Sequence, residues 1–267
     1  MDDRILEIKI SSLADYVSAT AIFERGAGFR GVPDSEFLLL PTAGRLKPGY
    51  SRPGALWLER SMFVSFKQYA YAFEKTEKYI DLAILGQHYG LPTRLMDWTV
   101  SPLVALFFAV RSHPDRDAAV YVLDEGHESY ARDEIPYADF IMNESKPAMR
   151  EFLKSKFYRK KENDLEAYLQ FILHREEFSV VRAFPKNISP RISAQSSFFT
   201  LHIDPFTPLT EHISKKIIIS KKLKKEIFFA LEKNGIHEFT LFPGLEGLCG
   251  WLKTVYYDQC LTGGQFD

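Results

Sequence analysis

The chain has 267 residues, with a formal net charge of −1 at pH 7. Hydrophobic residues make up 46% and charged residues 26%, which is typical of a folded globular protein and excludes a disordered chain. The near-zero charge gives no bulk attraction to nucleic acid or to an anionic membrane. Two cysteines, Cys249 and Cys260, are too few for a disulfide framework.

The sequence lacks several motifs that would indicate a secreted protein, a membrane protein or a common class of enzyme. The first residues are charged and lack the apolar core of a signal peptide. The longest apolar runs, such as 103–110, are too short to cross a bilayer. The serine-hydrolase, zincin, P-loop and Rossmann motifs are absent, as are the paired cysteines of a zinc site. We therefore expect a cytoplasmic protein with no membrane partner and no metal.

The first half of the chain is predicted to be mainly helical. Ser12 has the side chain of an N-cap, and Gly90 with Pro92 ends a later helix. Ser101-Pro102 are an N-cap and first helical residue. The helices expected here are 13–23, 56–73, 78–88 and a buried one over 102–110, and the strands are 5–10, 27–31 and 118–123.

The second half mixes strands and helices. We expect helical structure over 147–174, strands at 178–184, 194–202 and 216–220, and a helix over 221–234 that Gly235 ends. Residues 239–241 are predicted to be extended, before a last helix over 245–256. Because there is no regular strand–helix alternation, the prediction is an α+β fold. It is a single domain over 1–267, with a helical N-terminal half around a mixed β-sheet core.

One stretch, from Gln87 to Ser101, is unusually rich in polar and aromatic residues. It has neither a helical period nor strand alternation, so it is predicted to be a loop between two buried elements. Binding and catalytic residues concentrate on such loops. The alternative is a tight connection whose polar groups satisfy one another.

An early Arg-Gly pair is a candidate for anion binding. The guanidinium of Arg30 can form two bonds with a phosphate or carboxylate. Gly31 beside it lets a ligand or another backbone come close. The alternative is that Arg30 pairs with a structural carboxylate such as Glu59.

The remaining candidates each have a structural alternative. His88, at a helix C-terminus, donates to a ligand or caps its helix. Arg94 and Asp97 contact substrate or pair with each other. Ser101 caps a helix or helps its N-terminus to hold an anion. Gln195, at a strand start, bonds a ribose or amide or faces water.

A lysine-rich run lies near the end of the chain. It is interpreted as a solvated face, with phosphate contact as the alternative. It lacks the interleaved aromatic residues of a single-strand-binding platform. Its members are Lys215, Lys216, Lys221, Lys222, Lys224 and Lys225.

Several segments together resemble the FRG domain family. Its aromatic-Arg-Gly motif corresponds to Phe29-Arg30-Gly31, and its central signature corresponds to QHYGLPTRLMDWTVSPLVALFFA from Gln87 to Ala109. The similarity continues at 191–195, 199–200, 217–219 and 241–244, so it covers most of the chain. The family is associated with bacterial and phage proteins, which implies a role in phage–host conflict.

The order of these motifs is similar to that of Arg-Ser-Glu ADP-ribosyltransferases. This resemblance implies an ADP-ribosyltransferase-like fold and NAD as substrate or ligand. Arg30 would hold the phosphate or ribose, and Thr99 with Ser101 would support the nicotinamide-ribose pocket. The last motif, 195–197, has Gln195 but no Glu. An acid would then come from Asp97 or Glu59, or the nucleotide would be bound without turnover.

The function predicted is therefore an FRG domain protein that binds NAD or a related nucleotide. It would transfer ADP-ribose to a protein or nucleic-acid acceptor, or cleave NAD. The alternative is a non-enzymatic sensor or adaptor that binds a nucleotide or a host or phage protein. The predicted catalytic residues are Arg30, His88, Arg94, Asp97 and Gln195, and the predicted cofactor-binding residues are Arg30, Gly31, Thr99, Ser101 and Gln195.

Overall fold

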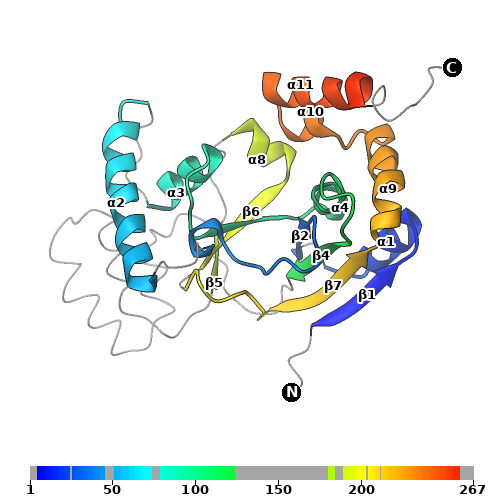
Figure 1. Ribbon diagram of the computed structural model, residues 1–267, viewed down its shortest axis with the longest axis horizontal. Coiled ribbons are helices and arrows are strands. Elements are labelled where there is room, and N and C mark those ends of the chain that lie inside the picture. The colour runs from blue at the N-terminus through cyan, green and yellow to red at the C-terminus, as the bar shows by residue number, and fades with distance from the viewer. Residues whose placement is uncertain are drawn as a thin grey trace.

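A mixed β-sheet forms the centre of the protein (Figure 1). The computed structural model describes residues 5–24, 26–45, 51–73, 79–123, 180–183, 189–202, 204–210 and 212–258. Within these ranges the sheet has seven strands in the order β1-β7-β4-β2-β3-β6-β5. The strands are β1 (Leu6–Ile10), β2 (Gly28–Val32), β3 (Leu95–Thr99), β4 (Ala118–Leu123), β5 (Val180–Ala183), β6 (Ser197–His202) and β7 (Ile213–Ile219). Only β1 and β7 pair in parallel among these strands.

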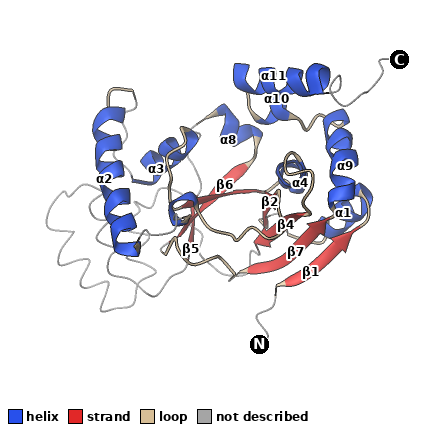
Figure 2. Cartoon of the chain, in the orientation of Figure 1, coloured by secondary structure: helices blue, strands red, loops and turns tan. Residues whose placement is uncertain are grey.

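Helices lie above and on both sides of the sheet in the view of Figure 2. Their bounds are α1 (Leu13–Thr20), α2 (Arg52–Ala70), α3 (Tyr79–His88), α4 (Pro102–Val110), α8 (Pro190–Ala194), α9 (Lys221–Lys233), α10 (Glu238–Leu241) and α11 (Leu245–Leu252), with the 3-10 helix η1 (Thr42–Gly44) and the π-helix η2 (Lys253–Asp258). The α+β class and the mixed sheet are confirmed. Along the chain, α1 lies between β1 and β2, α2 and α3 lie between β2 and β3, and α4 lies between β3 and β4.

The two faces of the sheet are covered differently. Val120 and Val122 on β4 face a core made with α1, α4 and α9. Tyr121, between them, faces a second core that includes Leu39 and Leu209 from the loops on the other side. Successive side chains of a strand point to opposite faces, so both sides of these central strands are buried. The sheet is therefore a fixed frame between two apolar layers.

Local capping residues begin and end the helices as predicted. The Ser12 hydroxyl accepts a hydrogen bond from the Asp15 backbone N–H at 3.1 Å. Ser101 does the same for Val104 at the start of α4. Gly90 and Gly235 have φ values of 89° and 78°, a left-handed conformation that glycine adopts without strain.

Two local predictions are wrong, and one lies outside the described residues. The stretch from Gln87 to Ser101 is not all loop, because Leu95–Thr99 is the central strand β3. Both its faces are covered, which removes the alternation that would have indicated a strand. Residues 239–241 belong to the helical turn α10 rather than to an extended segment. The helix expected over 147–174 lies outside the described residues.

The lysine-rich run is only partly a solvated face. Lys224 is 2% exposed, and its ammonium donates to four backbone carbonyls in loops beyond β2 and α4. Lys216 pairs with Glu7 at 2.9 Å. These two side chains therefore hold neighbouring segments together. No helix in the described ranges is both long and apolar enough to cross a membrane.

Candidate functional site

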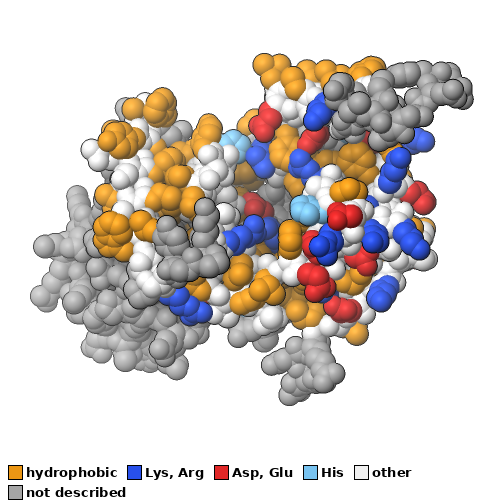
Figure 3. Space-filling model, viewed as in Figure 1, with side chains coloured by type: hydrophobic (Ala, Val, Ile, Leu, Met, Phe, Trp, Pro, Cys, Tyr) orange, Lys and Arg blue, Asp and Glu red, His pale blue; other side chains and the backbone are white. Residues whose placement is uncertain are grey.

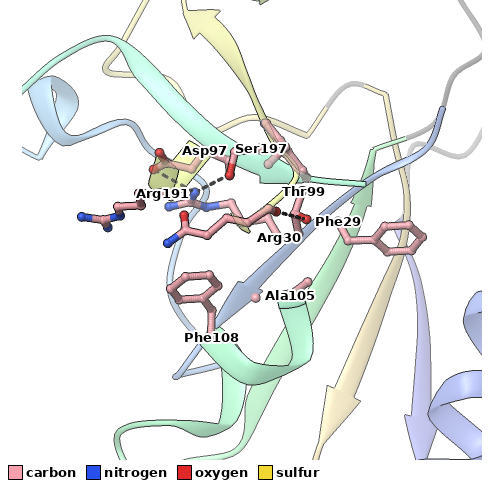
Figure 4. A pocket seen from close by; sticks show the side chains of 11 residues that line it. Phe29, Arg30, Asp97, Thr99, Ala105, Phe108, Arg191 and Ser197 are labelled. Carbon is pink, nitrogen blue, oxygen red and sulfur yellow. Dashed lines mark hydrogen bonds and ion pairs between the residues drawn. The ribbon is translucent and has the colours of Figure 1, made fainter. Parts of the chain in front are cut away.

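A pocket of about 170 Å³ lies where β2, β3, α4 and α8 meet (Figure 4). It brings together residues from motifs that are far apart in the sequence. Arg30, Gly31, Asp97, Thr99 and Gln195, all predicted from the sequence, line it. The other lining residues are Phe29, Trp98, Ala105, Phe108, Arg191 and Ser197.

Arg30 occupies an opening in the sheet. Strands β2 and β3 share a single registered pair, Phe29 with Thr99. The Arg30 Nη1 atom donates to the Asp97 backbone oxygen at 2.6 Å, in place of a bond between strands. Within the described part of the chain, no hydrogen bond of its Nε or Nη2 atoms is found. Arg30 therefore keeps donors for a ligand, although its side chain is only 18% exposed.

Charge and burial oppose each other at Arg30. Burial lowers the pKa of its guanidinium, and the nearby Asp97 carboxylate raises it. The Asp97 Oδ2 atom lies 3.7 Å from Arg30 Nη1. A guanidinium stays protonated in proteins even when its pKa is lowered, so the pocket contains a half-buried fixed cation.

Asp97 is held in place by a chain of side-chain hydrogen bonds. Its Oδ1 atom accepts from Gln87 Nε2 at 2.7 Å, and the Gln87 amide oxygen accepts from the Thr93 hydroxyl. The Thr93 oxygen in turn accepts from the Leu95 N–H at 3.1 Å. The carboxylate nevertheless remains 57% exposed. It is therefore both oriented by the protein and open to a ligand.

Thr99 and Gln195 join the two sides of the pocket. The Thr99 hydroxyl donates to the Gln195 backbone oxygen at 2.7 Å and accepts from the Ser101 N–H at 3.0 Å. The Gln195 amide nitrogen donates to Leu241 O at 3.0 Å. Gln195 is the residue after α8 rather than the first residue of a strand, and it is buried rather than facing water. Its side chain therefore links α8 to α10.

Gly31 is required by packing within the fold. A Cβ atom added there would lie 1.8 Å from the Ala105 backbone oxygen and 2.7 Å from the Ala109 nitrogen. Both atoms belong to the backbone of α4, which no rotamer change can move. Of the two alternatives for Gly31, the structure supports the close approach of another backbone. Gly31 thus sets the distance between α4 and β2 at the pocket.

Arg191 on α8 and Phe108 on α4 line the pocket but were not predicted as site residues. Figure 4 shows Phe108 on α4, below Arg30. It also shows Arg191 at the end of the pocket opposite Phe29. A signal for Arg191 exists, because Ser189-Pro190 begins a helix as Ser101-Pro102 does.

Part of the chain matches a known protein family. The model of the FRG domain matches residues 25–118. The chain contains an FRG domain. No curated protein and no solved structure matches this chain. The matched residues include β2, β3 and α4, so the FRG domain supplies Arg30, Asp97 and Phe108 to the pocket. Arg191, Gln195 and Ser197 lie beyond the match, and a single FRG domain over 1–267 stays a prediction.

Arg94 lies within the FRG match but does not line the pocket. It is 1% exposed, and its Nε atom donates to both oxygens of Glu59 at 2.7 and 2.8 Å. The predicted alternative of an Arg94–Asp97 pair is wrong, and so is the predicted pairing of Arg30 with Glu59. Residues three apart on an extended chain point to opposite faces, which separates Arg94 from Asp97. Arg94 therefore connects β3 to α2.

His88 and Ser101 also lie outside the lining of the pocket. His88 is exposed at the end of α3 and packs edge-on against Tyr89. The partial burial that remains, followed by the positive charge of Arg191, lowers the pKa of His88, and Glu246 opposes this. Ser101 acts as the N-cap of α4. Neither His88 nor Ser101 lines the pocket.

A row of buried polar side chains joins β3 to β6. The Trp98 indole donates to the Thr200 hydroxyl at 2.9 Å, and that oxygen lies 3.1 Å from His202 Nε2. Burial, together with Arg30 and Arg94, lowers the pKa of His202 to about 3. This imidazole is therefore neutral at physiological pH, and it adds no third positive charge behind Arg30.

Apolar and charged side chains occupy different parts of the surface around the site (Figure 3). Basic and acidic side chains gather in a hollow near the centre of this face, between an apolar surface over α2 and a charged surface over α9. In the described ranges, no group of three His, Cys, Asp or Glu side chains is placed to hold a metal ion. Among the described lining residues, the chemistry available is that of two guanidinium groups, one carboxylate, an amide, hydroxyls and aromatic rings.

Proposed function

We propose that the pocket binds an anionic nucleotide, with NAD as the first ligand to test. The observation that carries this proposal is the meeting of Arg30, Asp97, Thr99 and Gln195, from three separate motifs, around one cavity. Arg30 has donors without a partner in the described part of the chain. Guanidinium groups bind phosphate through paired, charge-assisted hydrogen bonds. The aromatic ring of Phe108 offers an apolar surface beside them.

The size of the pocket limits how a dinucleotide would bind. Its volume of about 170 Å³ is below the ~300–1,000 Å³ usual for sites that enclose a whole small molecule. We therefore propose that one part of the nucleotide enters the pocket and that the rest lies along the outer surface. The charged hollow in Figure 3 offers a path for that outer part.

Turnover would depend on Asp97. The other candidate acid, Glu59, is buried against Arg94 and does not line the pocket. Loss of nicotinamide leaves a cation-like ribose, which a nearby fixed carboxylate stabilises in the transition state. Asp97 is the one carboxylate among the described lining residues, and it is exposed. ADP-ribose would then pass to water, or to a protein or nucleic-acid acceptor.

A second function, binding without turnover, is favoured by a specific observation. The Asp97 carboxylate already accepts from Gln87 and lies beside Arg30. These contacts engage the carboxylate with the protein itself, which leaves it less available to a reacting ribose. The chain would then be a sensor or adaptor that binds a nucleotide. Three expectations stay predictions: binding of a host or phage protein, a role in phage–host conflict, and a cytoplasmic location.

One experiment separates these functions. Purified protein is incubated with NAD labelled on the adenine, with and without cell lysate. Thermal shift, nicotinamide release and label transfer are measured. The variants are Arg30→Gln and Asp97→Asn, and the control is Arg116→Gln, an exposed arginine outside the pocket.

We expect NAD to raise the melting temperature of the native protein and of the control, but not that of Arg30→Gln. If the chain is an enzyme, Asp97→Asn retains the shift and loses nicotinamide release. If it is a sensor, the native protein shows the shift alone. Absence of both shift and release in the native protein would contradict the proposal.

A further inference from the structure

Arg191 is a cation in the pocket wall with no carboxylate partner in the described part of the chain. Its guanidinium stacks on the Phe242 ring, 4.6 Å from the ring centroid. It is half-buried and lines the same pocket as Arg30. Charges in a partly desolvated pocket interact more strongly than they would in water. Two arginines that line one small pocket therefore favour an anionic ligand.

The fold fixes where Arg191 lies. Ser189 caps the start of α8, and Gln195 after its end donates to the Leu241 carbonyl. Phe242 follows Leu241, so this hydrogen bond brings the aromatic ring to α8. Stacking uses the face of a guanidinium and leaves the N–H groups at its edge available. Arg191 is therefore oriented before any ligand arrives.

A second arginine on the same ring provides a direct comparison. Arg111 lies 5.2 Å from the Phe242 centroid. Its Nη2 atom pairs with Glu238 at 2.6 Å, and Arg111 does not line the pocket. Two arginines thus share one phenylalanine. The one with a carboxylate partner supports structure, and the other lines the cavity.

We propose that Arg191 is a second anion-binding side chain, and that with Arg30 it selects ligands that carry a diphosphate. This inference rests on the proposed nucleotide-binding function and names the ligand class. The two arginines line the pocket from different elements, β2 and α8. A diphosphate has one anionic phosphoryl group for each of them, whereas a single phosphate has one group for both. Nucleoside diphosphates and dinucleotides belong to this class.

The test uses inorganic pyrophosphate and inorganic phosphate as probes, followed by NAD. Binding is measured by calorimetry on the full chain, and folding of each variant is checked by its melting curve. The variants are Arg191→Gln, Arg191→Lys and Arg30→Gln. Arg111→Gln is the matched control, because it also removes an arginine from the Phe242 ring.

Pyrophosphate is expected to bind the native protein more tightly than phosphate does. Arg191→Gln should weaken pyrophosphate binding roughly tenfold to a hundredfold, which corresponds to the loss of a hydrogen bond to a charged group. Arg191→Lys should recover part of the lost affinity, because lysine restores the positive charge but not the planar guanidinium with its paired donors. Arg111→Gln should bind pyrophosphate as the native protein does.

The inference is overturned if pyrophosphate fails to bind at millimolar concentration, if phosphate binds equally well, or if Arg191→Gln binds pyrophosphate normally. Failure of the proposed function looks different. If pyrophosphate binds in an Arg191-dependent manner and NAD does not bind, the diphosphate site stands and the NAD proposal fails. If NAD binding depends on Arg30 but is unchanged in Arg191→Gln, the NAD proposal stands and the role proposed for Arg191 fails.

Discussion

Breaking the buried ion pair between Arg94 and Glu59 should destabilise the protein without changing the pocket directly. The two side chains are 1% and 7% exposed, and Arg94 Nε lies 2.7 and 2.8 Å from the two Glu59 oxygens. The Arg94→Met variant leaves the Glu59 carboxylate buried without this guanidinium. An unpaired buried charge is far more costly than the pair itself is stabilising.

The expected loss follows from this burial. Removing one partner of a buried pair costs about 3–5 kcal/mol. For a protein of this size, that lowers the melting temperature by roughly 10 °C or more. An exposed pair provides the control, because Arg52 and Asp204 lie 3.6 Å apart with side chains 62% and 45% exposed. Arg52→Met should cost less than about 1 kcal/mol.

The assay is urea unfolding of Arg94→Met, Glu59→Met, the double variant and Arg52→Met. The double variant should be more stable than the sum of the two single losses predicts, because both charges leave together. Pyrophosphate binding by folded Arg94→Met should remain close to that of the native protein. A loss below about 1 kcal/mol for Arg94→Met, or strictly additive effects, would refute the reasoning.

Three further variants test other parts of the structure. Gly31→Ala should cost roughly 3 kcal/mol or more in urea unfolding, because its Cβ would lie 1.8 Å from the Ala105 backbone oxygen; near-native stability would show that α4 moves easily. Lys224→Met should cost about 2–4 kcal/mol, because four carbonyls lose their donor. The exposed neighbour, Lys225→Met, should have little effect, and equal losses would contradict the role given to Lys224. The pKa of His202 falls from 6.5 to about 3 on folding, so its contribution is complete above pH 6.5 and is lost as the pH falls towards 3. The stability of His202→Gln should therefore decline less steeply than that of the native protein between pH 6.5 and about 4, and parallel profiles would exclude this effect.

Local signals were sufficient for much of the fold. An N-cap such as Ser12 or Ser101 bonds to an N–H only three residues away. The left-handed conformation of Gly90 and Gly235 is likewise a property of one residue. Such effects are contained within a few residues, and the helix ends could therefore be predicted.

Strand β3 shows why the central stretch was misread. Its burial is nearly complete on both faces, and only Asp97 is exposed. Alternation of polar and apolar residues arises when one face of a strand meets water. A strand in the middle of a sheet covered on both sides carries no such pattern. Its place next to β2 and β6 depends on pairing across about 70 and 100 residues of chain.

The sequence itself determined the helix caps, the Phe29-Arg30-Gly31 motif and the composition of the stretch from Gln87 to Ser101, because each depends on neighbouring residues. Only the tertiary structure decided which charges pair. It placed Arg94 against Glu59 and left Asp97 beside Arg30, because side chains three residues apart on an extended chain point to opposite faces. It also brought Arg191 into the pocket wall across a long separation in sequence. Partner choice among charged side chains depends on distances in space, which local sequence does not encode.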